Sequence, residues 1–388
     1  MRSLAKILSA SMVLLTLGCS LSPTNVPSTA TVEPSQITFP PVITQSAPTV
    51  VPVISKIPTP AEGHLYHGIY PGGHTGHEDD IVLEDLLSYE ETVGKSAAWV
   101  YFSNNWYHSR AFPMETATWI RAADSIPYIR LMLRSGLKHD GSEPVFTLQN
   151  ILDGKFDADL HAWCAKARSF GTAILAEYGT EANSDSFAWS GISNGGGTTN
   201  DYGDPAQPDG PERFKDAYRH IIQICRDEGA QNITWVFHVG NESFPDEDWN
   251  RMENYYPGGE WIDWMGISIY GTYSPQSSYV NEFRPGMDEI HTRVLKLAPH
   301  KPIIIAEFGT AKNNPKLDQA QWAREALTAI TSLQYSNVIG FSWWNERWQN
   351  DDDPAHDTTM RVQDNTELAQ VFQELVAKNA IVLAEIAP

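Results

Sequence analysis

A short apolar segment followed by a loop and an amphipathic helical stretch recurs along most of the chain. This recurrence limits the fold more than any other feature. The predicted strands are residues 65–70, 97–102, 128–133, 173–178, 233–237, 262–269, 303–306 and 338–343. The predicted helical stretches are residues 83–93, 114–123, 161–170, 212–227, 279–297, 317–333 and 366–378. Apolar strands that alternate with helices are typical of a parallel sheet with crossover helices.

The number of strands distinguishes two architectures of this kind. Eight strand–helix units within residues 63–388 favour a closed (β/α)8 TIM barrel that forms one domain. An open doubly wound sheet is the main alternative, and it usually carries a glycine-rich phosphate turn after its first strand. Here the first strand runs into Tyr70-Pro71-Gly72-Gly73-His74, which has no G-x-G-x-x-G pattern. We therefore predict the barrel.

The charge of the chain excludes some partners. There are 48 acidic and 27 basic residues, for a formal net charge of −21. Such a chain repels phosphate backbones and anionic lipids, which argues against nucleic-acid binding. Its 13 tryptophans either fill a large core or offer flat surfaces on which a ligand can stack.

The N-terminus resembles an export signal. Arg2 and Lys6 precede an apolar stretch, residues 7–17, that is too short to span a bilayer. Cys19 follows at the expected cleavage point, as in bacterial lipoproteins, so we predict a signal peptide over residues 1–19 and lipidation of Cys19. An ordinary secretion signal is the alternative. Residues 20–62 are rich in Pro and Thr and are predicted to be a linker, so the barrel would be exported and anchored at a membrane or cell surface only by lipid.

Two cysteines remain, Cys164 and Cys225, each in a helical stretch that precedes a strand. Export permits disulfides, so a bridge is feasible if the helices are neighbours. Two separate buried thiols are the alternative, because the sequence does not supply the geometry.

Two glutamates follow strands at the end of the barrel where catalytic residues gather. Glu181 follows the fourth strand, and Glu307 follows the apolar run of the seventh. Two facing carboxyl groups can hydrolyse a glycosidic bond, one as an acid and the other as a nucleophile or base. Ion pairing with Arg130 or Arg134 is the structural alternative. Glu177 shares the inward face with Glu181 but lies deeper, so we expect it to support the site.

Other kinds of catalytic site are less well supported. His64, His67, His74 and His77 lie near the first strand without the spacing typical of a metal site, so no metal is predicted. The chain has no G-x-S-x-G motif of a serine hydrolase, and no motif calls for a cofactor.

Three ordered motifs resemble those of glycoside hydrolase family 26. Residues 256–267, YPGGEWIDWMGI, followed by Tyr270, are similar to its strand-six signature. Residues 301–309, KPIIIAEFG, resemble its nucleophile strand, and Glu181-Ala182-Asn183 with Trp189 resembles its acid/base segment. The resemblance implies that Glu181 is the acid/base and Glu307 the nucleophile of a retaining mechanism.

The resemblance also implies a sugar-binding groove. Tyr270 would bond to the nucleophile, and Trp343 or Trp344 would stack on the sugar. We further expect contacts from two tryptophans and three polar side chains at strand ends or in the following loop: Trp106, Trp189, Asn105, Asn183 and His238. The expected partner is a neutral β-linked polysaccharide or oligosaccharide, and the enzyme is expected to be a monomer.

Three departures from the family pattern bear on the substrate. Thr180 replaces a histidine, Ser268 replaces an acid, and Glu177 replaces an arginine. Family frequency favours β-1,4-mannan, and the alternatives are a mixed-linkage β-1,3-1,4-glucan and β-1,3-xylan. The departures also raise a hypothesis of another class, a polysaccharide-binding lipoprotein without catalysis. Retention of both glutamates favours the enzyme.

Overall fold

The computed structural model describes residues 56–73, 77–137 and 143–386. Every element discussed below lies in one compact unit of these residues. The predicted signal peptide, Cys19 and most of the predicted linker lie outside the described residues and stay predictions. None of the helices in the described ranges combines the length and apolar character needed to cross a bilayer.

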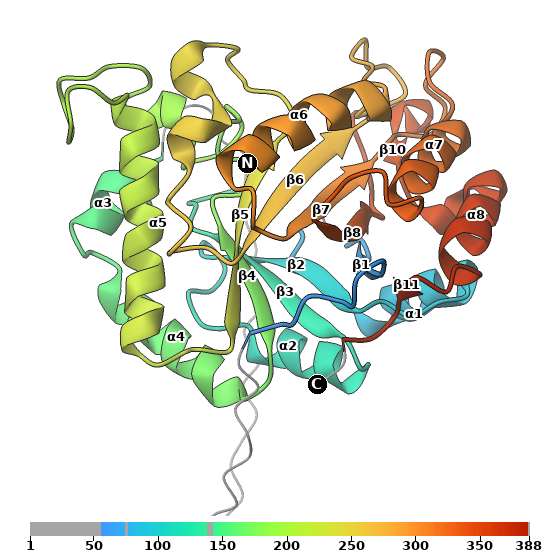
Figure 1. The fold of residues 1–388 in the computed structure, drawn as a ribbon, viewed down its shortest axis with the longest axis horizontal. Helices are drawn as coiled ribbons and strands as arrows, with labels where there is room; N and C mark the ends of the chain where they lie inside the picture. The colour runs from blue at the N-terminus through green and yellow to red at the C-terminus, as the bar shows by residue number, and fades with distance from the viewer. Residues whose placement is uncertain (1–55, 74–76, 138–142, 387–388) are drawn as a thin grey trace, which may run out of the picture. The chain divides into compact units, whose positions relative to one another are not determined.

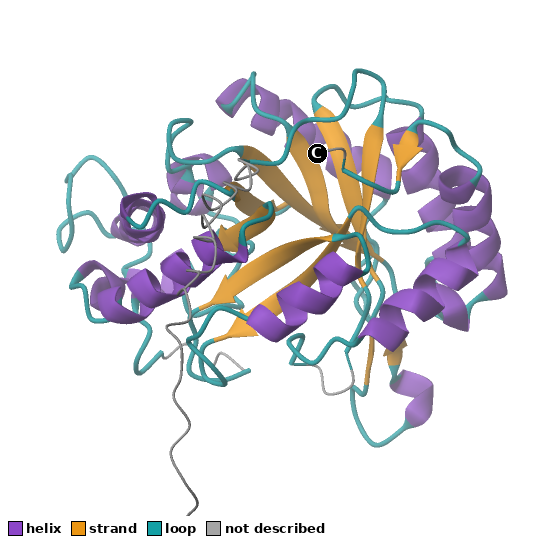
Figure 2. Ribbon diagram, turned by 90° about the horizontal axis from the view of Figure 1, so that it is seen from below, coloured by secondary structure: helices purple, strands orange, loops and turns teal. Residues whose placement is uncertain are grey.

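Eight parallel strands form a closed ring, which confirms the predicted (β/α)8 barrel (Figures 1 and 2). Each strand pairs with its neighbours in sequence, and β8 returns to β1 through pairs such as Tyr66 with Gly340. The strands are β1 (Leu65–Tyr70), β2 (Trp99–Asn105), β3 (Ile126–Met132), β4 (Ile174–Tyr178), β5 (Ile233–Gly240), β6 (Trp264–Tyr270), β7 (Ile303–Gly309) and β8 (Val338–Trp344). A short strand, β11 (Val382–Leu383), pairs with β1, and β9 (Arg347–Trp348) pairs with β10 (Thr358–Thr359).

Helices cover the outside of this ring (Figure 2). They are α1 (Leu83–Val93), α2 (Met114–Ala122), α3 (Leu148–Leu152), α4 (Asp157–Phe170), α5 (Asp209–Asp227), α6 (Phe283–Leu297), α7 (Gln319–Thr331) and α8 (Thr366–Phe372). A single π turn, η6 (Gln373–Ala377), continues α8. Short 3-10 turns are η1 (Gly191–Asn194), η2 (Asp248–Asn250), η3 (Met252–Tyr255), η4 (Pro354–His356) and η5 (Val362–Asp364).

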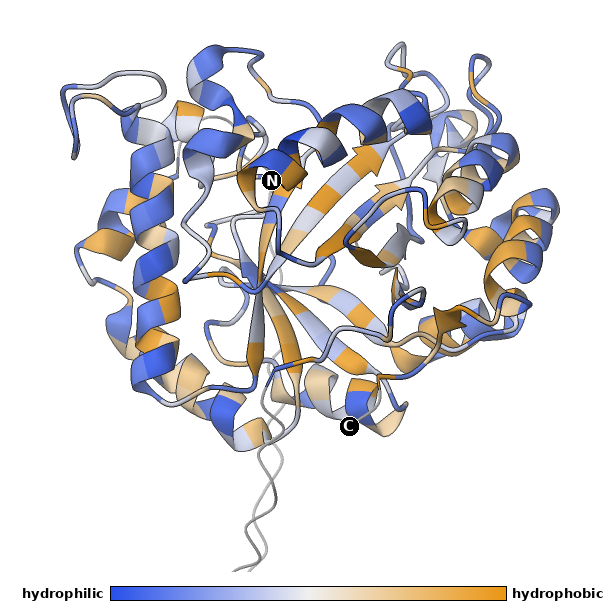
Figure 3. Ribbon diagram, viewed as in Figure 1, coloured by the Kyte–Doolittle hydropathy of each residue, from blue (hydrophilic) through white to orange (hydrophobic). Residues whose placement is uncertain are grey.

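The longest helix shows why these segments become helical. Along α5, buried Phe214, Tyr218, Ile221 and Cys225 recur at spacings of three and four residues, which puts them on one face. Polar residues occupy the remaining positions, and Figure 3 shows the resulting mixture of blue and orange along the helix. The apolar face packs inward, so burial against the barrel rather than helix propensity alone stabilises α5.

The two cysteines that the sequence left open form a disulfide. Cys164 on α4 is bonded to Cys225 on α5, with their Cα atoms 4.9 Å apart. Both side chains are buried, and the bond links two neighbouring outer helices. It therefore fixes the α4–α5 side of the barrel, next to β4.

The folded domain begins earlier than the predicted boundary at residue 63. Lys56 Nζ lies 2.6 Å from Asp263 Oδ1, and the backbone N–H of Ile57 donates to Thr234 Oγ1 at 2.8 Å. The Ile57 side chain is buried. Residues 56–62 thus belong to the barrel domain, because one apolar residue in a Pro- and Thr-rich segment docks on its surface.

Candidate active site

A bulge in β7 sets the position of Glu307. Ile267 of β6 pairs with Ile305, but the next residue, Ser268, pairs with Glu307, so Ala306 is an extra residue on β7. A bulge of this kind bends a strand locally and redirects its side chains. The strand also runs three residues beyond the predicted end at residue 306, which places Glu307 inside the ladder rather than after it.

The Glu307 carboxylate is buried and lies next to two tyrosine hydroxyls and a guanidinium. Tyr270 Oη donates to its Oε2 at 2.7 Å, and Tyr101 Oη, whose one proton is shared with Glu177, lies 3.0 Å from its Oε1. Arg130 Nη2 lies 3.7 Å from Oε1. The Tyr270 contact implied by the family resemblance is confirmed. Hydroxyl donors and a nearby guanidinium stabilise the negative charge of Glu307 and fix its orientation.

Left-handed backbone positions bring Glu181 to the mouth of the barrel. Gly179 has φ of 74° and Glu181 has φ of 49°. At residue 179 a Cβ atom would lie 2.2 Å from the ring of Phe214, so only glycine fits there. A non-glycine residue with positive φ costs on the order of 1 kcal/mol, and such positions cluster at functional sites.

Glu181 is half-buried, and its surroundings favour the protonated form. Burial, followed by the charge of Glu307, raises the pKa of Glu181 to about 7, against the opposing effects of His238, a Ser268 hydrogen bond and Arg130. A carboxyl group with this pKa carries its proton in much of the population at neutral pH. It can therefore act as a general acid beside an ionised carboxylate.

Beneath this pair lies Glu177, in the deeper position that the sequence indicated. It is fully buried, and its oxygens accept hydrogen bonds from the hydroxyls of Tyr101, Tyr128 and Thr180. Burial alone would raise the pKa of Glu177, but His238 and Arg130 outweigh it and hold the pKa at about 2. Glu177 is thus a fixed negative charge in the floor of the site.

His238 differs from its predicted role in reading sugar hydroxyls. It is fully buried, with Nδ1 3.1 Å from both oxygens of Glu177 and Nε2 2.7 Å from Ser268 Oγ. Burial opposes its protonation, but the charge of Glu177 raises the pKa of the ring. His238 therefore connects Glu177 to the site from below and does not face the groove.

Three of the predicted stacking tryptophans are packing residues. Trp189 and Trp343 have no exposed surface, and their indole N–H groups donate to backbone oxygens of Thr180 at 2.8 Å and Met360 at 2.7 Å. Trp106 is buried and packs edge-on against Phe146 and Phe156. Side chains from other elements cover the rings, as Phe308, Trp322 and Phe372 cover that of Trp343, and a position near a strand end does not reveal this.

The two predicted asparagines are also structural. Asn105 is buried, donates to the carbonyl of His77 and accepts from Arg134 at 2.8 and 3.0 Å. Asn183 is buried, and its side chain bonds to backbone groups of Gly240 and Glu242. Both amides join neighbouring strand ends, so their hydrogen-bonding capacity is used within the protein.

Trp344 keeps its predicted place at the site. Its ring stacks on Tyr70 with centroids 4.0 Å apart, and its indole N–H donates to Glu346 at 3.1 Å. The guanidinium of Arg130, which contacts Glu307, lies 5.4 Å from the centre of the same ring. Trp344 is thus the predicted tryptophan next to the groups around Glu307, and its contact with sugar stays a prediction.

A cleft of about 290 Å³ opens above Glu181 and Tyr270. The sequence did not single out the aromatic residues that line it, Phe244, Tyr273 and Tyr279. They lie in the loops that follow β5 and β6, and their position after strand ends was the available signal. A run of polar and aromatic residues in such a loop, here 270–279, points to the mouth of the barrel.

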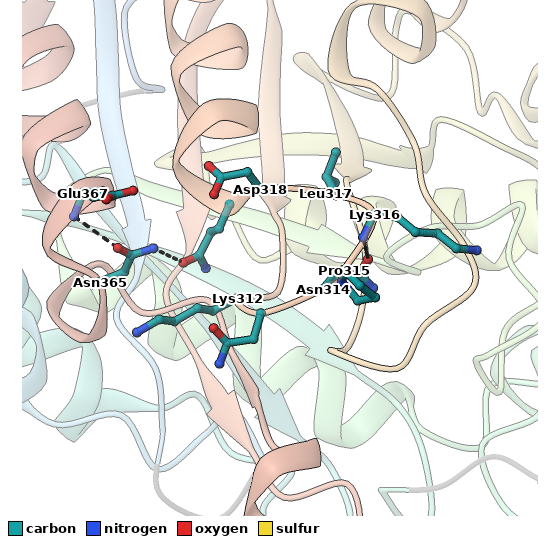
Figure 4. Close-up of a pocket in the computed structure, with 10 residues that line it drawn as sticks. Lys312, Asn314, Pro315, Lys316, Leu317, Asp318, Asn365 and Glu367 are labelled. Atoms are coloured by element: carbon teal, nitrogen blue, oxygen red, sulfur yellow. Dashed lines mark hydrogen bonds between the residues drawn. The ribbon is translucent and has the colours of Figure 1, made fainter.

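A larger hollow of about 590 Å³ lies elsewhere, where the loop after β7 meets the start of α8 (Figure 4). It is lined by Lys312, Asn314, Asp318 and Glu367, among others, and it contains neither Glu181 nor Glu307. The volume of a cavity therefore does not by itself identify the candidate active site of this barrel. The two neighbouring carboxyl groups, Glu181 and Glu307, identify it.

One of the histidines near β1, His67, has its ring nitrogens bonded within the protein. His67 is buried, with Nδ1 3.2 Å from the carbonyl of Ser96 and Nε2 2.8 Å from Tyr89 Oη. His74 lies outside the described residues. Within the described ranges, no group of three or more His, Cys, Asp or Glu side chains could hold a metal ion.

Comparisons with known proteins agree with the motifs. The chain is 26% identical over 297 residues to endoglucanase H of Acetivibrio thermocellus, an alignment that covers 75% of this chain. The alignment takes in only 29% of that protein, so this chain spans less than a third of its relative's length.

Solved structures share the barrel. GH26C from Muricauda sp. MAR_2010_75 superposes with a TM-score of 0.59 at 14% identity, over 84% of this chain and 88% of that chain. A GH26 β-mannanase from Bacteroides ovatus gives a TM-score of 0.57 at 12% identity, over 83% and 90%. The model for glycosyl hydrolase family 26 matches residues 180–339, a span that includes Glu181, Tyr270 and Glu307. Over this span the chain is therefore similar to glycosyl hydrolase family 26.

Proposed function

We propose that the protein is a retaining endo-β-glycanase in which Glu181 is the acid/base and Glu307 the nucleophile. One observation carries the proposal. A half-buried carboxyl with a pKa of about 7 lies beside a second carboxylate that two tyrosines hold in place. Such a pair of groups with opposed protonation states is what glycosidic hydrolysis needs.

The reaction would take place in two steps. Glu181 transfers its proton to the glycosidic oxygen while a Glu307 oxygen attacks the anomeric carbon, which releases the shortened chain and leaves a glycosyl ester. The ionised Glu181 then removes a proton from water, which attacks the same carbon and frees Glu307. A retaining pathway requires carboxyl groups about 5–5.5 Å apart. Tyr270, which donates to Glu307, lines the same cleft as Glu181, so the two carboxyl groups share one site.

A neutral β-glucan, mixed-linkage β-1,3-1,4-glucan in particular, is the proposed substrate. The chain aligns at 26% identity, over 75% of its length, with a protein named endoglucanase. Thr180 and Ser268, two departures from the mannanase pattern, bond to Glu177 and His238. β-1,4-Mannan is the second candidate, because several solved structures with this fold are named mannanases.

The location is also proposed. The pattern of residues 1–19 supports export and lipid attachment at Cys19. The Cys164–Cys225 bond accords with export, since disulfides persist in oxidising compartments. Metabolic labelling with palmitate should mark the wild-type chain and leave Cys19→Ala unmarked. Equal labelling of both would contradict the anchor.

Release of reducing ends from lichenan, mannan, xylan and laminarin tests the activity. We expect lichenan to be cleaved fastest, with a β-configured first product by proton NMR. Glu307→Gln should abolish hydrolysis while the fold is kept, as checked by circular dichroism. Binding of a glycan without cleavage would instead support the alternative of a binding lipoprotein, and an α-configured product would contradict retention.

A further inference from the structure

The cleft beside Glu181 has an aromatic wall that the catalytic step does not use. Tyr273 is 45% exposed, and its ring stacks on Tyr279 with centroids 5.4 Å apart and planes at 26°. The Tyr273 ring also lies 5.4 Å from that of Tyr270, which bonds to Glu307. The three rings form a continuous path from the nucleophile to the rim of the barrel. Phe244, also 45% exposed, lines the same cleft.

This wall is held rigidly. The carbonyl of Tyr273 accepts a hydrogen bond from Thr358 Oγ1 at 2.9 Å. The buried Asn314 side chain donates to the carbonyls of Ser274 and Ser277, both at 3.0 Å. The hydroxyl of Tyr279 donates to Glu242 at 3.1 Å. A surface that is fixed before a ligand arrives loses little conformational freedom on binding.

The position of the cleft defines which part of a substrate it would take. Glu181 lines it and Glu307 does not. In a retaining reaction the acid protonates the leaving oxygen, and the nucleophile attacks from the opposite face of the sugar. The side of Glu181 is therefore the leaving-group side.

The chemistry of the lining suits a neutral sugar. Exposed aromatic faces match the C–H faces of pyranose rings. The remaining side chains are acceptors or small hydroxyls, among them Asp185, Ser186 and Glu242, and no lysine or arginine is among the lining residues of the described cleft. Carboxylates accept hydrogen bonds from sugar hydroxyls and repel uronic acids.

We propose that Phe244, Tyr273 and Tyr279 bind the sugar residues that leave in the first step, and that Tyr273 is the main stacking surface. This inference rests on the proposed glycanase activity. It assigns the extended substrate to the loops after β5 and β6. It also explains why the cleft reaches beyond the two glutamates.

The inference can be tested with two substrates that place the same disaccharide on the Glu307 side of the cleaved bond and differ in the leaving group. One is the tetrasaccharide of the preferred glucan, and the other is the disaccharide β-fluoride, whose leaving group has no ring to stack. For Tyr273→Ala we expect kcat/KM on the tetrasaccharide to fall about tenfold further than on the fluoride, a factor typical of one lost stacking contact. Tyr273→Phe keeps the ring and should restore the wild-type ratio.

Leu87→Ala, which removes an exposed side chain on α1, serves as a control for general effects of truncation. If Tyr273→Ala lost the same factor of kcat/KM on both substrates, or lost none on either, the inference would be overturned. Cleavage of both substrates by the wild-type enzyme would still support the proposed glycanase activity. Absence of wild-type hydrolysis of both substrates would overturn the proposed function and the inference with it.

Discussion

His238 Nε2 lies 2.7 Å from Ser268 Oγ, and Ser268 in turn hydrogen bonds to the carboxyl of Glu181. The opposite ring nitrogen faces Glu177, which is fully buried and ionised. A fixed charge in the barrel floor thus orients the imidazole, and the imidazole orients the hydroxyl beside the proposed acid. All three departures from the family pattern, Glu177, Ser268 and Thr180, belong to this one connected set.

Removal of the Ser268 hydroxyl should move the alkaline limb of the pH profile. Its hydrogen bond lowers the pKa of Glu181, against burial and the charge of Glu307, which raise it. In Ser268→Ala the pKa of Glu181 should therefore rise, and because the acid must be protonated, kcat/KM should persist to higher pH. Ser268→Thr keeps a hydroxyl and is the matched control. A limb that stays in place or moves to lower pH would contradict this role of Ser268.

Glu181 should make the fold less stable as pH rises. Its folded pKa of about 7 lies above the ordinary value of 4.5, so the stability that it contributes is fully present below pH 4.5 and is lost as pH rises towards 7. The loss should be about 1–3 kcal/mol. Glu181→Gln removes this titrating group. In urea unfolding, the free energy of unfolding of the variant should therefore rise relative to that of the wild type between pH 4.5 and pH 8. A difference independent of pH would argue against the raised pKa.

The Cys164–Cys225 bond should stabilise the barrel mainly by restricting the unfolded chain. For a closed loop with a sequence separation of 61 residues, the chain-entropy relation gives roughly 4 kcal/mol, and measured effects are often about half of that. The double substitution Cys164→Ala/Cys225→Ala should lower the free energy of unfolding accordingly. The reducing agent dithiothreitol should destabilise wild type and leave the double variant unchanged. Equal sensitivity of both to the reductant would contradict this account.

Trp344 and Trp343 should respond differently to substitution. Trp344 is also buried, but it lies beside the groups around Glu307, so Trp344→Phe should mainly weaken activity, about tenfold or more. Trp343 is fully buried among Phe308, Trp322 and Phe372, so Trp343→Phe should mainly lower stability, by about 1–3 kcal/mol. Kinetics and thermal unfolding of the two variants, measured side by side, check this. The reverse pattern would place Trp343 at the sugar.

The fold could be predicted because its signal is repeated. Most strands of the barrel contain a run of apolar residues, and α1 lies at residues 83–93 as the periodicity indicated. Helix α3 was missed, since five residues are too few to show a helical period. The extension of β7 to Gly309 was missed because it contains the polar Glu307, which the bulge accommodates.

The candidate site was predictable only in part. Glu181 and Glu307 stand out because burying an unpaired carboxylate at the end of an apolar strand costs free energy, so such a residue is expected to have a function. His238, Asn183 and Trp189 are equally polar or aromatic at strand ends, yet they are covered. Whether such a side chain faces the groove depends on the loop that crosses it, and loop paths leave little periodic signal in the sequence.

The pairing of β1 with β8 affects how the protein is made. Tyr66 finds its partner Gly340 only after nearly the whole domain has been synthesised. Until then, the nascent sheet is an open ribbon with unpaired edges on β1 and on whichever strand emerged last, and such edges bind to other chains. A product that stops before β8 would keep both edges and is expected to aggregate. Closure of the ring is thus the event that ends the vulnerable period of synthesis.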